Sequence, residues 1–217
     1  MTEFDDRRRM MVDTQVRPSD VTKFPIIQAM LTVPRERFVP DAQREAAYAD
    51  VLVPLGGGRS LLEPRTFAKM LDAANIAGDE VVLDVGSGLG YSAAVSARLA
   101  QLVIAVEQDE GMADETQSLL TEAGVDNAVV HNGPLTQGAA EHGPYDVILI
   151  EGGVESVPET LISQLKDGGR IVALFMEGTL GAVRLGLKVG GQVSWRFVFN
   201  ATAPVLPGFQ RAKEFVL

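Results

Sequence analysis

The chain has 217 residues, of which 46% are hydrophobic and 22% are charged. These proportions are those of a globular domain and exclude an intrinsically disordered chain. The absence of cysteine from the sequence excludes disulfides, thiolate metal sites and cysteine nucleophiles. We also expect no metal, because the two histidines, His131 and His142, have no repeated carboxylate pattern around them.

The formal net charge is −10, and residues 1–45 contribute nothing to it because they hold equal numbers of acidic and basic side chains. An acidic body repels phosphate backbones, so we expect no nucleic-acid partner. No apolar run approaches the roughly 18 residues of a membrane helix, and residues 1–6 lack the apolar core of a signal peptide. A cytoplasmic protein with no membrane partner is therefore expected.

The N-terminal third is predicted to be mainly helical. Helical spacing covers residues 7–31, with an interruption at 17–19, and returns over residues 65–76. Between these helices, residues 33–40 contain two prolines and are predicted to be extended. Residues 56–58 are three glycines and are predicted to form a flexible connector.

From residue 79 onward, short β-rich runs alternate with helical segments. Strands are predicted at residues 81–85, 102–106, 128–130, 145–150 and 170–175, and helices at 93–102, 110–123 and 158–166. This alternation predicts an α/β fold with a mostly parallel sheet covered by helices on both faces. Residues 182–199 are predicted to be a β-hairpin with a Gly190-Gly191 turn, so the sheet ends in an antiparallel strand.

The strongest local signal is a glycine loop between the first predicted strand of the sheet and the next helix. It has glycine at positions 86, 88 and 90, followed by Tyr91. Such a loop lets a ligand approach the backbone, and the free N–H groups of the following helix attract an anion. A dinucleotide fingerprint would have glycine or alanine at position 91, so the tyrosine argues against a pyrophosphate ligand.

Glu107 ends the second predicted strand of the sheet, 21 residues after Gly86. A carboxylate at this place accepts hydrogen bonds from both hydroxyls of an adenosyl ribose and repels a 2′-phosphate. The alternative interpretation is structural: residues 86–90 are then only a tight turn, and Glu107 is a solvated strand end.

The sequence resembles the protein-L-isoaspartate O-methyltransferase family over about residues 10–175. The matching segments are 33–40 (VPRERFVP), 47–50 (AYAD), 54–56 (PLG), 58–60 (GRS), the glycine loop, 144–150 (PYDVILI) and 164–172 (QLKDGGRIV). The resemblance implies a Rossmann-like fold that depends on S-adenosyl-L-methionine (SAM), with a seven-stranded, mostly parallel sheet and an N-terminal helical extension. We expect residues 1–76 to form this extension with the substrate-side segment, and residues 77–217 to form the SAM-binding domain.

The resemblance also assigns residues to the cofactor, with S-adenosyl-L-homocysteine (SAH) as its product. It implies that the glycine loop holds the methionine part of SAM and that Glu107 holds the ribose. The cofactor-binding residues expected on this basis are Asp84, Gly86, Ser87, Gly88, Gly90, Tyr91, Glu107, Gln108 and Leu135. Tyr91 either covers the methionine part of SAM or packs its ring in the core.

The sequence departs from the family pattern in two places. The family usually has Gly-Gln-Thr-Ile-Ser before the proline at position 64, and here Ser60 takes the threonine position and Leu62 the serine position. In the family, the serine is thought to orient the substrate carboxylate. Ser60 is the candidate catalytic residue, as a donor to that carboxylate, and the alternative is a loop serine whose hydroxyl bonds to the backbone. After the third predicted strand of the sheet, Gly133-Pro134-Leu135 replaces the usual Gly-Asp-Gly, which leaves Leu135 to pack against the adenine.

The implied reaction needs no general base. An isoaspartyl α-carboxylate titrates near ~3.5 and is already an anion at pH 7, so the protein has only to align it with the methyl group. Arg59 or Arg65 is a candidate partner of that carboxylate, although arginines are more often solvated. Glu151 is a weaker catalytic candidate at the end of the fourth predicted strand of the sheet.

Three functions remain open from the sequence. The first is methylation of isoaspartyl residues in damaged proteins. The second is a SAM-binding member of the family with weak or no isoaspartyl activity, because Leu62 replaces the family serine. Such a protein acts as a binding or regulatory protein, or methylates another acceptor. The third is a nicotinamide-linked oxidoreductase, against which Tyr91 argues. The oligomeric state is open.

Overall fold

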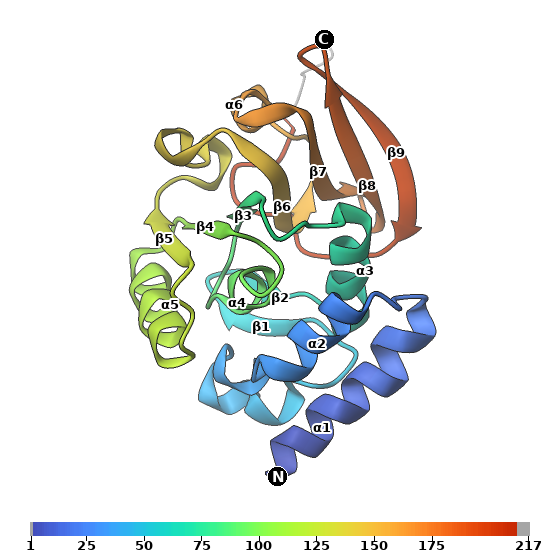
Figure 1. The fold of residues 1–217 in the computed structure, drawn as a ribbon, viewed down its shortest axis with the longest axis vertical. Coiled ribbons are helices and arrows are strands. Elements are labelled where there is room, and N and C mark those ends of the chain that lie inside the picture. The colour runs from blue at the N-terminus through green and yellow to red at the C-terminus, as the bar shows by residue number, and fades with distance from the viewer. Residues whose placement is uncertain (1, 212–217) are drawn as a thin grey trace.

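The computed structural model describes residues 2–211. Its main feature is a seven-stranded sheet in the order β5-β4-β3-β6-β7-β8-β9, in which the first four pairs are parallel and the last two are antiparallel (Figure 1). The strands are β3 (Val81–Val85), β4 (Leu102–Glu107), β5 (Ala128–Asn132), β6 (Tyr145–Val154), β7 (Leu165–Glu177), β8 (Leu180–Val189) and β9 (Gln192–Asn200). The predicted α/β class, the parallel sheet and its antiparallel end are confirmed.

Both faces of the sheet are buried, because neighbouring residues of a strand point to opposite sides. Val82 and Val103 belong to one apolar cluster, whereas Leu83 and Ile104 belong to the other. The first cluster lies under the N-terminal helices and α3, α4 and α5. The second lies under α6 and the C-terminal segment, where Leu206 and Phe209 are buried.

The helices cover the sheet largely where the sequence predicts them. They are α1 (Glu3–Met11), α2 (Phe24–Thr32), α3 (Pro64–Ala74), α4 (Tyr91–Ser96), α5 (Glu110–Glu122) and α6 (Glu159–Ser163). A π-helical turn at Val12–Val16 and a 3₁₀ turn at Arg17–Ser19 join α1 to the segment before α2, at the predicted interruption. Helices α4 and α6 are shorter than predicted. No helix among residues 2–211 is both long enough and apolar enough to cross a bilayer.

Two N-terminal predictions are wrong. The segment predicted to be extended contains a 3₁₀ helix at Arg35–Arg37, and the neighbouring Phe38 is completely buried. The predicted flexible connector is instead the tight turn of a hairpin formed by β1 (Val53–Gly56) and β2 (Arg59–Leu61), with positive φ at all three glycines. This hairpin is a separate two-stranded sheet, and it lies with α1 and α2 in the lower half of Figure 1.

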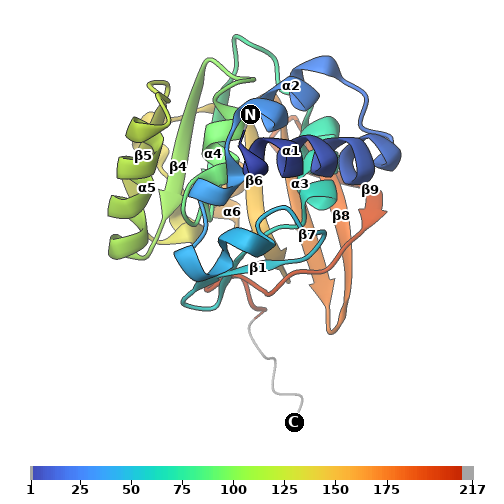
Figure 2. The same ribbon diagram turned by 90° about the horizontal axis from the view of Figure 1, so that it is seen from below.

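The N-terminal helices share the first apolar cluster with the sheet. Met11, Val16 and Met30 are in the same cluster as Val82 and Leu149. Figure 2 shows α1, α2 and α3 together on one side of the sheet. The division into residues 1–76 and 77–217 stays a prediction.

Candidate active site

The glycine loop leaves β3 and leads into α4, as the sequence predicts. Gly86, Gly88 and Gly90 all have positive φ, at 83°, 58° and 91°. A Cβ atom on Gly88 would lie 2.5 Å from the side chain of Leu55, and one on Gly90 would lie 2.7 Å from that of Thr116. Both the backbone conformation and the close packing therefore require glycine here.

Glu107 lies beside this loop at the end of β4, the neighbour of β3. Its Oε2 accepts a hydrogen bond from the backbone N–H of Gly88 at 3.0 Å. Its Oε1 accepts from the backbone N–H groups of Gln108 and Asp109, at 2.9 and 3.2 Å. The side chain has no exposed surface. The structure thus brings Glu107 and the glycine loop together, as expected.

A residue from outside the sheet completes this arrangement. Arg59, at the start of β2, donates from Nη1 to both oxygens of Glu107, at 2.8 and 2.9 Å, and from Nη2 to the carbonyl oxygen of Gly86 at 2.6 Å. The arginine is 5% exposed. The expectation that Arg59 is solvated is therefore wrong, because it is buried and paired with Glu107. Its pairing with a substrate carboxylate stays a prediction.

Several polar atoms of the site are buried without a hydrogen-bond partner. They are Oδ1 of Asp84, Oγ of Ser87, Oε1 of Glu151 and Nε of Arg59. Buried polar groups in proteins are normally satisfied, so an unpaired group marks a strained or functional place. This set lies around the carboxyl ends of β3 and β6, the edge where ligands bind in such sheets.

Two carboxyl groups of the site have strongly raised pKa values. Burial raises the pKa of Asp84 to about 7, although a hydrogen bond from Ser92 Oγ at 2.6 Å acts in the opposite direction. Burial also raises the pKa of Glu151 well above its ordinary value, and the nearby Asp84 charge adds to this shift. Burial therefore disfavours the charged forms of both acids.

Tyr91 lies in the core at the start of α4. Its side chain is completely buried, with ring centroids 6.1 Å from Phe38 and 5.7 Å from Phe67. The guanidinium carbon of Arg35 lies 4.8 Å from the Tyr91 ring centroid. The Tyr91 ring therefore packs in the core, which is one of the two expectations for this residue. A contact of Tyr91 with the cofactor stays a prediction.

The other candidate residues lie around the same region. Ser60 is half-buried in β2, and its hydroxyl makes no hydrogen bond within residues 2–211. Leu62, two residues further, is buried in the main core rather than facing an open site. Leu135 is buried in the second cluster, and Gln108 is exposed at the end of β4. Arg65 is half-exposed and lies within 3.5 Å of Asp50 and Glu63.

The two histidines, for which the sequence predicts no metal-binding role, lie close together in space. His131, Glu141 and His142 have potential ligand atoms within 4.8 Å of one another, and Glu141 and His142 are exposed. Their clustering arises from the 3₁₀ turn at Ala140–His142, which returns the chain to the end of β5. The expectation that the chain holds no metal stays a prediction.

Sequence reasoning did not identify the buried roles of Arg59, Arg35 and Leu206. Arg59 stands where the resembled family has glutamine, and this charge change was the one available signal. Leu206 covers the loop from a segment that the family pattern does not match. Its backbone is paired with Gly153, and its Cδ1 would lie 3.2 Å from a Cβ on Gly86.

The fold and this edge of the sheet define the class of a Rossmann-like methyltransferase. Two solved structures share the fold. One is a protein-L-isoaspartate O-methyltransferase, with TM-score 0.80 and 24% identity over 94% of this chain and 66% of its own. The other is a Plasmodium falciparum protein, described as a protein-L-isoaspartate O-methyltransferase in complex with SAH, with TM-score 0.78 and 18% identity over 92% of this chain and 97% of its own.

The sequence comparisons give the family. The family model for protein-L-isoaspartate(D-aspartate) O-methyltransferase matches residues 7–183. Protein-L-isoaspartate O-methyltransferases of Syntrophus aciditrophicus and Pelotomaculum thermopropionicum are 38% and 40% identical to this chain. They cover 79% and 76% of it, and the matches span 79% and 72% of their own lengths. The chain belongs to the protein-L-isoaspartate(D-aspartate) O-methyltransferase family, and it is a SAM-dependent methyltransferase.

The chemistry of the site fits the cofactor of this family. A glycine loop at the start of a helix suits an amino-acid carboxylate, and Glu107 at the end of the neighbouring strand suits the two ribose hydroxyls. The buried oxygens of Asp84 and Ser87 have no hydrogen-bond partner among the described residues, and their contact with the cofactor stays a prediction. The one feature that does not suit the ribose is Arg59, which already occupies the Glu107 carboxylate.

Proposed function

We propose that this chain transfers a methyl group from SAM to the α-carboxylate of isoaspartyl residues in damaged proteins. The observation that carries the proposal is the joining of Glu107 to the glycine loop, within a chain of this family. The comparisons favour this function over a member without isoaspartyl activity. Tyr91 argues against a nicotinamide cofactor, because a dinucleotide fingerprint has glycine or alanine at this position.

The cofactor supplies an activated methyl group on a sulfonium sulfur. The residues proposed to hold it are Gly86, Ser87 and Gly88 of the loop, with Glu107 for the ribose and Leu135 for the adenine. The chain then has to orient the acceptor carboxylate and exclude water, because that carboxylate is already ionised near pH 7. Ser60 is the proposed orienting residue, since its hydroxyl is free within residues 2–211 and follows Arg59 directly.

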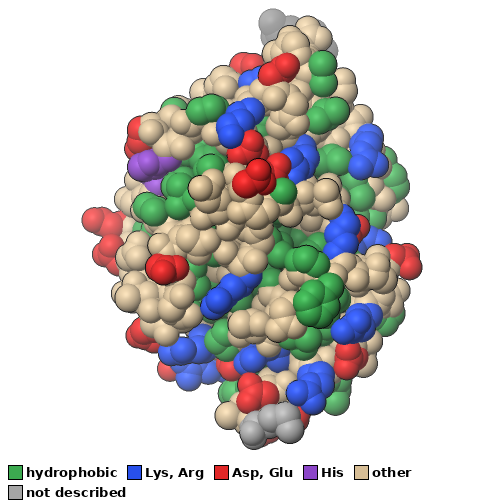
Figure 3. Space-filling view, in the orientation of Figure 1, with side chains coloured by type: hydrophobic (Ala, Val, Ile, Leu, Met, Phe, Trp, Pro, Cys, Tyr) green, Lys and Arg blue, Asp and Glu red, His purple; other side chains and the backbone are tan. Residues whose placement is uncertain are grey.

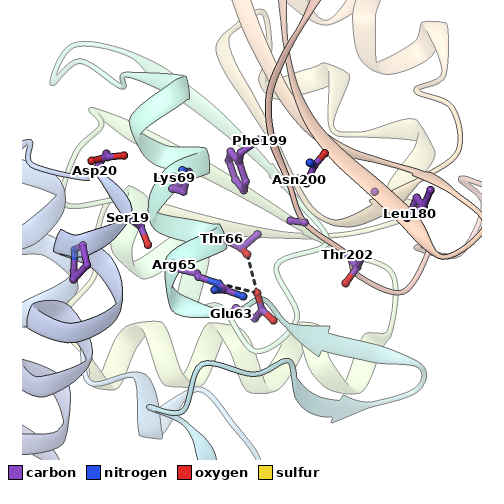
Figure 4. Close-up of a pocket in the computed structure, with 13 residues that line it drawn as sticks. Ser19, Asp20, Glu63, Arg65, Thr66, Lys69, Leu180, Phe199, Asn200 and Thr202 are labelled. Carbon is purple, nitrogen blue, oxygen red and sulfur yellow. Dashed lines mark hydrogen bonds and ion pairs between the residues drawn. The ribbon is translucent and has the colours of Figure 1, made fainter.

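A cavity of about 760 Å³ is the proposed place for the polypeptide around the acceptor (Figure 4). Its walls come from the start of α3 and from the end of β9, including Arg65, Lys69 and Phe199. The Lys69 ammonium lies 4.9 Å from the Phe199 ring centroid. The lining also holds the carboxylates of Asp20 and Glu63, so cations, anions and an aromatic ring together suit a polypeptide of mixed character.

The cavity is connected to the cofactor site by two short segments. Residues 59–63 run from Arg59 beside Glu107 to Glu63 in the cavity wall. Residues 202–206 run from Thr202 in the wall to Leu206 over Gly86. The proposed acceptor cavity and the proposed cofactor site are therefore joined through two segments of five residues each.

The proposed partner is a protein or peptide that carries isoaspartate. Basic and acidic side chains are interspersed on the face in Figure 3, without the single-sign basic patch that a phosphate backbone needs. We propose a cytoplasmic location, which suits a repair reaction on the cell's own proteins.

The direct test is methyl transfer to a matched pair of peptides. One peptide contains isoaspartate, and its control has the same sequence with normal aspartate. With saturating labelled SAM, we expect base-labile methyl ester on the isoaspartyl peptide and none above background on the aspartyl peptide. If the protein binds SAH but forms no ester on either peptide, isoaspartate is not its methyl acceptor.

A further inference from the structure

We propose that Arg59 is a latch on the cofactor site: the cofactor binds only after the guanidinium of Arg59 has left Glu107. The inference rests on the proposed function for the identity of the cofactor. It concerns a residue of this chain that holds the site closed, and the test below separates the latch from the reaction.

The first argument is that the hydrogen-bonding capacity of Glu107 is used up. Its two oxygens take three backbone N–H groups and two contacts from Arg59 Nη1. A carboxylate offers about four lone-pair sites. The backbone donors belong to the loop and the strand end, so the contacts that ribose hydroxyls can replace are those of Arg59.

The second argument concerns space. A Cβ on Gly86 would lie 2.9 Å from Arg59 Nη2 and 3.2 Å from Leu206 Cδ1, and one on Gly152 would lie 2.6 Å from Leu206 Cδ2. All residues from 82 to 97 are buried. The face of the loop that a ligand must reach is thus covered by two side chains from segments far apart in sequence.

The third argument is that the closed arrangement can open without disturbing the main sheet. Arg59 Nε is buried without a partner, and the desolvation of a buried ion pair offsets much of its attraction. Arg59 also follows the exposed turn at residues 56–58 in a hairpin that is not part of the seven-stranded sheet. Movement of Arg59 therefore leaves the main sheet and its register in place.

The size of the expected effect follows from the closed population. When a ligand binds only the open form, its apparent dissociation constant equals the intrinsic constant divided by the open fraction. If the open form makes up on the order of 1–10% of the molecules, removal of the latch tightens binding roughly 10- to 100-fold.

The test is calorimetric titration of SAH into the full chain and three variants. Arg59→Gln removes the charge that holds Glu107, and Leu206→Ala removes the second cover. Arg44→Gln is the control, because its side chain is half-exposed and pairs only with the exposed Asp41 among the described residues. Melting of each protein without ligand shows whether it is folded.

We expect Arg59→Gln to bind SAH at least about tenfold more tightly than the unchanged chain. Arg44→Gln should bind as the unchanged chain does. Equal or weaker binding by folded Arg59→Gln would overturn the latch, and so would the absence of binding in every variant. If Arg59→Gln does not fold, a fourth variant, Arg59→Met, decides by the same criterion, because its side chain cannot donate to Glu107.

The two proposals fail in different ways. If Arg59→Gln binds SAH more tightly but the unchanged chain does not methylate the isoaspartyl peptide, the latch proposal is supported and the proposed function is rejected. If the unchanged chain methylates the isoaspartyl peptide but Arg59→Gln binds SAH with unchanged affinity, the latch proposal is rejected and the proposed function is supported.

Discussion

The guanidinium of Arg35 lies over the ring of Tyr91 in the core, with its carbon 4.8 Å from the ring centroid and neither side chain exposed. Arg35 Nε donates to the carbonyl oxygen of Ala47 and Nη2 to that of Leu62, both at 2.6 Å. One buried arginine therefore joins the N-terminal segment, the segment before α3 and the start of α4. This explains why a tyrosine is accommodated directly after the glycine loop.

Arg35→Ala should destabilise the protein by about 3–5 kcal/mol, because it leaves two carbonyl groups without their donor inside the core. Arg37→Ala is the matched control from the same 3₁₀ helix, since Arg37 is half-exposed and pairs with the exposed Glu122. Its effect should stay within about 1 kcal/mol. Urea denaturation of both variants measures the difference, and equal losses would contradict the role of Arg35.

Asp84→Asn should change how stability depends on pH. Burial raises the pKa of Asp84 from 3.8 to about 7 in the folded protein. The stability linked to its bound proton is present below about pH 4 and is lost as the pH rises through about 7. The asparagine variant has no such loss, and its amide oxygen can still accept the hydrogen bond from Ser92.

Between pH 4 and pH 8, the asparagine variant should therefore gain stability relative to the unchanged chain, by up to about 4 kcal/mol. Free energies of unfolding in urea at both pH values give this difference. Because each pH compares two proteins, the titration of the other carboxylates largely cancels. A relative stability that is the same at both pH values would show that Asp84 titrates normally.

The sequence was sufficient for the sheet and for the pairing of Glu107 with the glycine loop. Val81–Val85 and Leu102–Glu107 are short, mostly apolar runs, one followed by the glycine loop and one ending in a glutamate, and this pattern depends on local composition. The buried arginines were not predictable in the same way. Arg35 and Arg59 are buried because of partners 12 to 48 residues away, and nothing in their neighbourhood distinguishes them from solvated arginines.

Leu62→Ser, which would restore the family residue, should cost stability rather than act only on the substrate. Leu62 is 2% exposed and lies in the main core. Truncation of a buried leucine costs about 2–5 kcal/mol, and the hydroxyl is buried as well. Leu187→Ser is the control, because Leu187 is 45% exposed. Similar melting temperatures for both variants would place Leu62 in an open site.

The position of Leu62 shows why a family pattern does not fix side-chain environments. The sequence aligns Leu62 with a serine that faces substrate, but an apolar side chain gains free energy by entering the core. Ser60, two residues earlier on the short strand β2, stays half-buried. A difference of one residue type therefore changes which residues of this segment can contact an acceptor.

Ser60→Ala tests whether the remaining hydroxyl orients the acceptor. Loss of one hydrogen bond to a charged carboxylate costs about 1.5–3 kcal/mol, so kcat/KM for the isoaspartyl peptide should fall roughly 10- to 100-fold. Stability should be unchanged, since the hydroxyl has no partner among the described residues. Ser118→Ala on α5 is the control for steady-state kinetics, and an unaltered kcat/KM in Ser60→Ala would remove Ser60 from the site.

Amide hydrogen exchange with and without SAH tests the central claim most directly, because it locates the cofactor without relying on activity. We expect slower exchange in residues 84–91 and 105–109 when SAH is present, and unchanged exchange in β9. Protection confined to the cavity beside α3 and β9, or no protection at saturating SAH, would contradict a cofactor site at the carboxyl ends of β3 and β4.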